Sequence, residues 1–217
     1  MKYAIWITGI LASLGSAVAT PITIVSDTGN TQGQSILSAA AGEAWTQTGT
    51  YSNVTITFRL NGGVMFDGTG TAYLMNQIGA GTTAANEVTA PFAITAPVAT
   101  SSFITLFSGL NLGPGTYFLL IDGANSSTPV GASGTTSPTY TEDAGVSNIH
   151  EMVVTGTEAA FAPASTFSTS TNAFFFTVTG TAGAASSAPE PGTLAMLGSG
   201  FGGLILALRR RTKPSGY

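Results

Sequence analysis

The sequence predicts an all-β domain, an antiparallel β-sandwich resembling a jelly roll, flanked by an N-terminal signal peptide and a single C-terminal transmembrane helix. Short runs of alternating apolar and polar residues recur along the chain, and turns rich in glycine, proline, asparagine and aspartate separate them. No long stretch shows the period of an amphipathic helix. Each end of the chain carries an uncharged apolar segment beside basic residues.

Three segments show the clearest strand patterns. Residues 54–60 alternate Val, Ile, Phe and Leu with Thr and Arg, so we expect Arg59 on the polar face of its sheet. Residues 116–122 (TYFLLID) are more continuously apolar, as in a central strand that is covered on both faces. Residues 174–179 (FFFTVT) alternate again near the end of the domain. Weaker patterns predict strands at 22–25, 44–48, 71–76, 91–94, 103–107 and 149–155.

Three segments of the central region fit no clear strand pattern. Residues 35–44 (SILSAAAGEA) fit a short helix, and they fit a loop equally well. Residues 125–143, mostly Ser, Thr, Gly and Pro, predict a long surface loop. Residues 181–188 (TAGAASSA) predict a flexible linker. The sandwich is therefore expected to span residues 20–180.

The charge of the central region excludes several classes of protein. Between residues 20 and 188, one base (Arg59) and nine acidic residues give a net charge of −8, against −4 for the whole chain. A field of that sign repels phosphate backbones, so we expect no nucleic-acid partner. The chain has no cysteine, which excludes a disulfide scaffold and a cysteine nucleophile.

The N-terminal segment has the parts of a secretory signal peptide. Lys2 is followed by an apolar run over residues 3–14, and Ala17 and Ala19 form the small–x–small site that signal peptidase accepts. We expect cleavage after Ala19, with residues 1–19 removed. An uncleaved membrane anchor is the alternative, but the apolar run is shorter than the ~17–25 residues that a membrane span needs.

The C-terminal segment combines three features in a fixed order. Pro189, Glu190 and Pro191 come first, and Pro191 favours an extended conformation at Glu190, as proteases hold their substrates. An uncharged stretch over residues 192–208 follows, near the ~17-residue lower limit for crossing a bilayer. Three arginines come next and are expected to stay on the cytoplasmic side. They are Arg209, Arg210 and Arg211.

These features resemble the PEP-CTERM sorting signal of Gram-negative bacteria, here at residues 189–211 with a tail at 212–217. The resemblance implies an exosortase that recognises the Pro-Glu-Pro element, an inner-membrane helix that holds the chain transiently, and arginines that retain it. It also implies delivery to the cell surface or extracellular matrix, in association with exopolysaccharide. A plain, permanently membrane-anchored surface protein is the alternative interpretation.

Few residues in the central region suit catalysis or metal binding. His150 is the only histidine, and as a strand residue beside Glu151 it does not indicate a catalytic triad. Asp27, Asp67 and Asp122 lie in turn sequences that offer oxygen ligands for calcium, but none shows the spacing of a calcium loop. We therefore expect no cofactor and no resident metal.

The sequence leaves the activity of the central domain open between two classes. A non-enzymatic structural or binding module is the first, with Trp45 and Tyr140 as candidates for stacking on sugar rings because they flank irregular segments. A secreted glycan hydrolase is the second, and it requires two carboxylates in an open cleft. Choice-of-anchor sandwich domains carry segments similar to residues 51–60 and 112–123, which favours the same fold.

Overall fold

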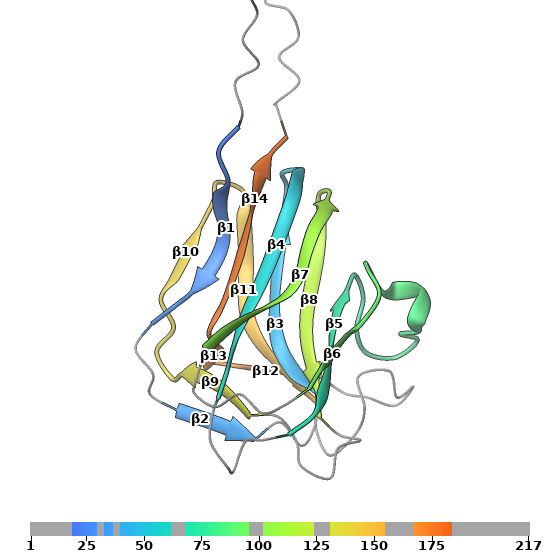
Figure 1. Cartoon of the computed structure of the whole chain (residues 1–217), viewed down its shortest axis with the longest axis vertical. Coiled ribbons are helices and arrows are strands. Elements are labelled where there is room, and N and C mark those ends of the chain that lie inside the picture. Colours follow the sequence, from blue (N-terminus) through green and yellow to red (C-terminus); the bar gives the residue numbers. More distant parts are fainter. Residues whose placement is uncertain are drawn as a thin grey trace, which may run out of the picture. The chain divides into compact units, whose positions relative to one another are not determined.

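The computed structural model describes residues 19–29, 33–36, 40–61, 68–95, 102–123, 131–154 and 167–183. These segments form two antiparallel β-sheets, shown in Figure 1, and so confirm the all-β prediction. The chain divides into two compact units, residues 1–183 and 184–217, and the described residues belong to the first. Their arrangement is β-sandwich-like, because side chains from both sheets share one apolar core.

The first sheet has eight strands. Six of them follow the order β10-β1-β14-β4-β9-β13, while β7 also pairs with β4 and β2 also pairs with β9. Their bounds are β1 (Ile22–Asp27), β2 (Gly33–Ile36), β4 (Tyr51–Leu60), β7 (Ser102–Leu112), β9 (Gly131–Thr135), β10 (Tyr140–Glu142), β13 (Ala173–Phe174) and β14 (Phe176–Ala182).

The second sheet has six strands in the order β12-β11-β3-β8-β5-β6. Their bounds are β3 (Ala41–Gln47), β5 (Gly70–Met75), β6 (Phe92–Ile94), β8 (Gly115–Asp122), β11 (Val146–Val154) and β12 (Phe167–Ser170). A short 3₁₀ turn, η1 (Ala84–Asn86), lies between β5 and β6 and is capped by the side chain of Thr83.

The core confirms the periodicity of the clearest strands. In β4 the alternate residues from Val54 to Leu60 are buried and the threonines between them are half-buried. Arg59 lies on the outer face, with its guanidinium carbon 5.6 Å from the ring centre of Phe175 and 6.0 Å from that of Phe103. The prediction that Arg59 points away from the core is therefore confirmed.

The helix expected at residues 35–44 is wrong. Residues 33–36 form β2, and β3 begins at Ala41 between β8 and β11, which take up its backbone hydrogen bonds. A Cβ atom on Gly42 would lie 1.7 Å from the carbonyl oxygen of Leu119 in β8. Sheet pairing thus overrides the helix propensity of the alanine-rich run.

The long loop expected at residues 125–143 is also wrong in part. It contains β9 and β10, both paired within the first sheet. The first two residues of the predicted linker, Thr181 and Ala182, belong to β14, where they pair with Ser52 and Tyr51 of β4, and residues 184–188 lie outside the described residues. The amide of Gly183 then donates to the carbonyl of Thr50 over 2.8 Å.

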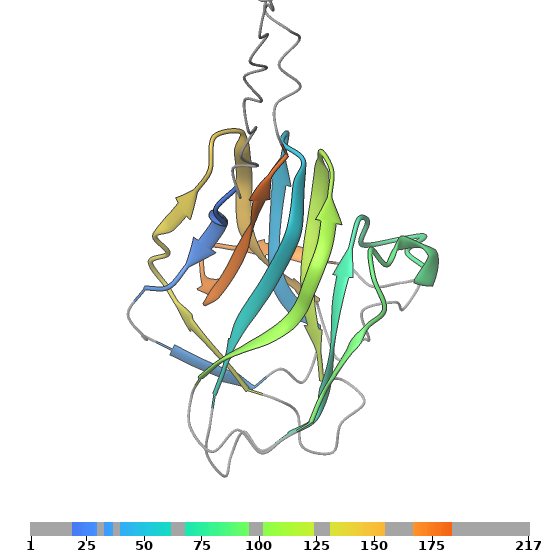
Figure 2. The same ribbon diagram turned by 45° about the horizontal axis from the view of Figure 1, so that its top comes forward.

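The chain enters and leaves the sandwich at the same end. Ile22 at the start of β1 pairs with Gly180 near the end of β14, and Figure 2 shows the two strands side by side. The predicted signal peptide, apart from Ala19, and the predicted C-terminal helix lie outside the described residues. Within the described segments, no helix is long and apolar enough to cross a bilayer.

Candidate functional site

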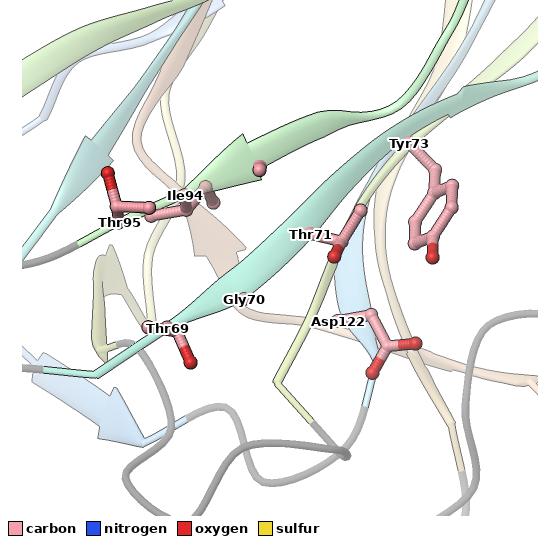
Figure 3. Close-up of a pocket in the computed structure, with 8 residues that line it drawn as sticks. Thr69, Gly70, Thr71, Tyr73, Ile94, Thr95 and Asp122 are labelled. Atoms are coloured by element: carbon pink, nitrogen blue, oxygen red, sulfur yellow. The ribbon is translucent and has the colours of Figure 1, made fainter.

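A pocket of about 270 Å³ opens where β5, β6 and β8 meet. Its wall combines polar and apolar surface in similar shares, and Figure 3 shows the side chains that form it. Three threonine hydroxyls, one phenol and one carboxylate contribute the polar groups. The lining residues are Thr69, Gly70, Thr71, Tyr73, Ala93, Ile94, Thr95 and Asp122.

Strand register explains why the polar groups of the pocket lie together. Thr71 of β5 stands opposite Asp122 of β8 and Ala93 of β6, so these three residues share one face of the sheet. Ala72 and Ile121, their neighbours along the strands, belong to the core. The polar residues therefore face away from the core, on the outer side of the second sheet.

Tyr73 and Asp122 supply the ionisable groups of the pocket. Burial raises the pKa of the Tyr73 phenol, the Asp122 carboxylate raises it further, and a hydrogen bond with the Thr71 side chain acts in the opposite direction. In Figure 3 the Tyr73 ring, the Thr71 hydroxyl and the Asp122 carboxylate lie on the same side of β5. A phenol ring beside a carboxylate and several hydroxyls offers both apolar contact and hydrogen bonds to a small polyhydroxy ligand.

A second group of polar residues lies between the sheets. Asp27 and Glu43 are fully buried, and Glu151 is 6% exposed. One carboxylate oxygen of each has no hydrogen-bond partner. Tyr140 faces Asp27 across β1 and β10. Within the described segments, no three acidic or histidine side chains are arranged so that they hold a metal ion.

Trp45 and Tyr140, the two residues predicted to stack on sugar rings, lie in β-strands and pack into the protein. Trp45 has no exposed surface, stacks on Tyr117 at 5.6 Å between ring centres, and donates its indole N–H to Gln47 over 3.0 Å. Its ring presents no face to an external sugar. Tyr140 is half-buried, packs against the core, and lies near the buried acidic residues rather than at an open surface.

The three aspartates considered for calcium have separate settings. The Oδ1 atom of Asp27 accepts a hydrogen bond from the Gly29 amide over 3.1 Å, which is an ordinary turn contact. Asp122 lines the pocket described above. Asp67 lies outside the described residues. The two aspartates that the structure describes, Asp27 and Asp122, thus lie apart, one between the sheets and the other on the outer side of the second sheet.

The arrangement expected of a glycan hydrolase is not seen at the acidic pair that the second sheet brings together. Glu43 and Glu151 stand opposite each other on β3 and β11, but both are enclosed between the sheets. Hydrolysis needs carboxylates that flank a glycosidic bond in an accessible cleft. His150 lies next to Glu151 on the other face of β11, where its Nδ1 atom is 2.7 Å from the carbonyl of Asn148.

Of the residues predicted to direct export and sorting, the structure describes only Ala19, which is exposed ahead of β1. Ala17, the Pro-Glu-Pro element and the three arginines lie outside the described residues. The comparison with protein families addresses this region directly. Residues 187–211 match the model of the PEP-CTERM protein-sorting motif.

The chain carries a PEP-CTERM sorting motif.

This motif is a recognition signal for exosortase, and it marks the chain as an exported protein that is processed at the membrane. The match confirms the resemblance based on residues 189–211. No curated protein and no solved structure matches the chain. The PEP-CTERM match covers the sorting segment and leaves the ligand of the sandwich to be inferred from its geometry.

Sequence reasoning singled out Asp122 of the pocket and Asp27 of the acidic cluster, but it brought neither group together. Thr69, Thr71 and Thr95 carry no distinctive motif. Their proximity depends on the pairing of β5 with both β6 and β8. Glu43 had a detectable signal, since it alternates with Ala41 and Trp45, but the predicted helix concealed that period.

Proposed function

We propose that the chain is an exported, non-enzymatic binding protein that exosortase sorts to the cell surface or extracellular matrix, where its sandwich binds exopolysaccharide. The observation that carries the sorting is the motif matched at residues 187–211. In this proposal signal peptidase removes residues 1–19, and residues 192–208 hold the chain in the inner membrane until Pro189, Glu190 and Pro191 are recognised. The three arginines from Arg209 to Arg211 favour the cytoplasmic side and delay release.

The sorting proposal predicts that processing depends on the Pro-Glu-Pro element. Replacing Pro189, Glu190 and Pro191 with alanine is expected to leave a longer, membrane-bound form, because the extended recognition segment is lost. Immunoblots of membrane and medium fractions, with mass spectrometry of the mature C-terminus, measure this. A triple alanine variant at residues 212–214, beyond the matched segment, is the control and should be processed normally. Unchanged processing of the first variant would instead support a plain membrane anchor.

A sugar unit of the exopolysaccharide is the ligand proposed for the pocket at β5, β6 and β8. The volume of about 270 Å³ is just below the usual ~300–1,000 Å³ of drug-sized ligand sites, which suits one small polar unit of a longer chain. The Asp122 carboxylate and the threonine hydroxyls match sugar hydroxyls, and Tyr73 supplies a ring. The net negative charge of the domain favours a neutral polysaccharide over an anionic one.

The ligand proposal predicts a loss of affinity when the pocket carboxylate is removed. Asp122→Asn is expected to weaken binding about tenfold or more, because a hydrogen bond to a charged group contributes about 1.5–3 kcal/mol. Exopolysaccharide isolated from the producing cells, and its fragments, serve as probes in calorimetry with the full-length protein. Glu142→Gln, at an exposed acidic residue on β10, is the matched control. Equal affinity of both variants would rule out this pocket, and release of shorter sugars by the wild type would support the hydrolase alternative.

A further inference from the structure

The interior of the sandwich contains three acidic side chains on three different strands. Ala41 and Trp45 of β3 belong to the core, so Glu43 between them points inward as well. Glu151 of β11 is directly opposite Glu43, and Asp27 of β1 is directly opposite the core residue Phe176. All three carboxyl groups therefore enter the space between the sheets.

The cluster joins the two sheets through backbone and side-chain contacts. Glu43 and Glu151 belong to the second sheet and Asp27 to the first. The Oε1 atom of Glu43 accepts a hydrogen bond from the amide of Phe174, in β13 of the first sheet. The other oxygen, Oε2, is buried without a partner, as are Asp27 Oδ2 and Glu151 Oε2. A buried carboxylate oxygen without a donor is costly, whereas a carboxylic acid carries its own donor.

No basic side chain in the described segments enters this space. Arg59 lies on the outer face of β4, and His150 lies on the opposite face of β11 from Glu151. The described parts of β9, β12, β13 and β14 contain no titratable residue. The strands paired with β1 and β3 carry four further titratable groups. Tyr140 packs against the core, Glu142 is exposed, the Tyr117 hydroxyl donates to the carbonyl of Gly113, and Asp122 lines the pocket on the outer side of the second sheet. Just after β10, Oδ2 of Asp143 accepts from the Tyr51 hydroxyl.

We propose that Asp27, Glu43 and Glu151 form a buried proton-binding site between the two sheets, so that folding takes up protons and acidic surroundings stabilise the sandwich. Protons supply the donors that the orphaned oxygens lack, and they remove the repulsion between three enclosed negative charges. The site differs from the pocket at β5, β6 and β8, and it does not depend on what that pocket binds.

The direction of the pKa shifts agrees with this arrangement. Burial raises the pKa of Glu43 well above its usual range, and the charges of Glu151 and Asp27 add to the effect, while the Phe174 amide opposes it. Burial also raises the pKa of Asp27 and of Glu151. For a carboxyl group whose pKa is higher in the folded state, the stabilisation is complete below the unfolded pKa, about 4. It is lost as the pH rises through the folded pKa.

The test is the pH dependence of unfolding of the full-length protein in detergent. Between about pH 5 and pH 8, the unfolding equilibrium constant is expected to rise up to tenfold per pH unit for each proton released. Glu43→Gln keeps an acceptor for the Phe174 amide and should flatten this profile, as should Glu151→Gln. Glu142→Gln, at an exposed site, should retain the wild-type slope.

Two results would overturn the proposal. One is a wild-type profile that is flat or rises in stability over this range, which needs no variant to fold. The other is stabilisation of the wild type by millimolar calcium at pH 7.5 that Glu43→Gln abolishes, since the site would then bind a cation rather than protons. A ¹³C NMR titration of the glutamate carboxyls in the folded wild type provides an independent readout, and a raised midpoint for Glu43 supports the proposal.

Discussion

At the scale of single residues, Gly42 shows how closely the strands of the second sheet approach each other. A Cβ atom on this residue would meet a backbone carbonyl, that of Leu119, rather than a side chain that is free to move. Neither backbone is able to shift without disturbing the pairing of β3 with β8. The absence of a side chain at residue 42 is therefore a packing requirement of the sheet.

Gly42→Ala is predicted to lower the free energy of unfolding by about 3 kcal/mol, at the upper end of the usual cost of overpacking. Chemical denaturation at constant pH measures the loss. Gly113→Ala is the matched control, because a Cβ atom there would meet nothing within 4 Å. Similar stability of the two variants would mean that β3 and β8 are not as close as described.

Trp45 illustrates the limit of reasoning from single residues. As an aromatic residue beside an apparently irregular segment, it fitted a surface contact with sugar. Its position in β3, between the inward residues Glu43 and Gln47, places it in the core. The role of a tryptophan ring therefore depends on the element that carries it: in a strand with alternating inward and outward residues, an inward ring packs in the core.

At the scale of elements, β10 is a short edge strand that pairs with β1, and the residue that follows it is held by hydrogen bonds of its own. The hydroxyl of Tyr51 in β4 donates to Oδ2 of Asp143, just after β10, over 2.8 Å. The amide of Asp143 donates to the carbonyl of Ile24 in β1 over the same distance. These two bonds fix the turn that carries the chain from β10 in the first sheet to β11 in the second.

Tyr51→Phe is predicted to destabilise the domain by about 2 kcal/mol at neutral pH, because the lost bond has a charged acceptor. Tyr117→Phe, which loses a bond to the neutral carbonyl of Gly113, should cost about 1 kcal/mol and serves as the control. Burial and Asp143 raise the pKa of the Tyr51 phenol to about 12. Its contribution should therefore be complete below about pH 10 and lost as the pH rises toward 12.

A smaller cost for Tyr51→Phe than for Tyr117→Phe in urea denaturation would contradict this assignment. Absorbance at 295 nm provides a direct check on the phenol, since the folded wild type should show a tyrosine that ionises later than the same residue in the unfolded chain. Burial raises the pKa of Tyr140 as well, so Tyr51→Phe is expected to reduce the late-ionising absorbance without abolishing it. An undiminished late component in Tyr51→Phe would contradict the assignment.

The strands that were predicted well from the sequence are those whose order of apolar and polar residues matches which of their side chains are buried. The strands β4, β8 and β14 have either strict alternation or a continuous apolar run, and both properties are local. The strands β9 and β10 were missed, and β3 was predicted only from residue 44, because the alanine, glycine and serine in these segments carry little local preference for a strand. Their structure comes from partners far away in the chain, such as Ile121 opposite Ala41.

At the scale of the whole molecule, the sorting signal is a local feature of the sequence, whereas the proposed binding site depends on residues that are distant in the chain. The sorting motif is contiguous, so its order and spacing were readable from residues 189–211 alone. The pocket and the buried acidic cluster are assembled from strands that are distant in sequence. Their chemistry becomes visible only when the register of both sheets is known, and of the pocket residues only Asp122 was singled out beforehand.

The position of β14 has a mechanical consequence. This strand is the last one of the domain, and it lies between β1 and β4, paired with both. Hydrogen bonds of an antiparallel ladder run across the strands, so tension applied to the chain beyond Gly183 and directed along β14 loads both ladders in shear. The hydrogen bonds of the two ladders then bear the load simultaneously instead of breaking one after another. A domain that is pulled from its C-terminal side is therefore expected to resist unfolding by the force of flowing liquid.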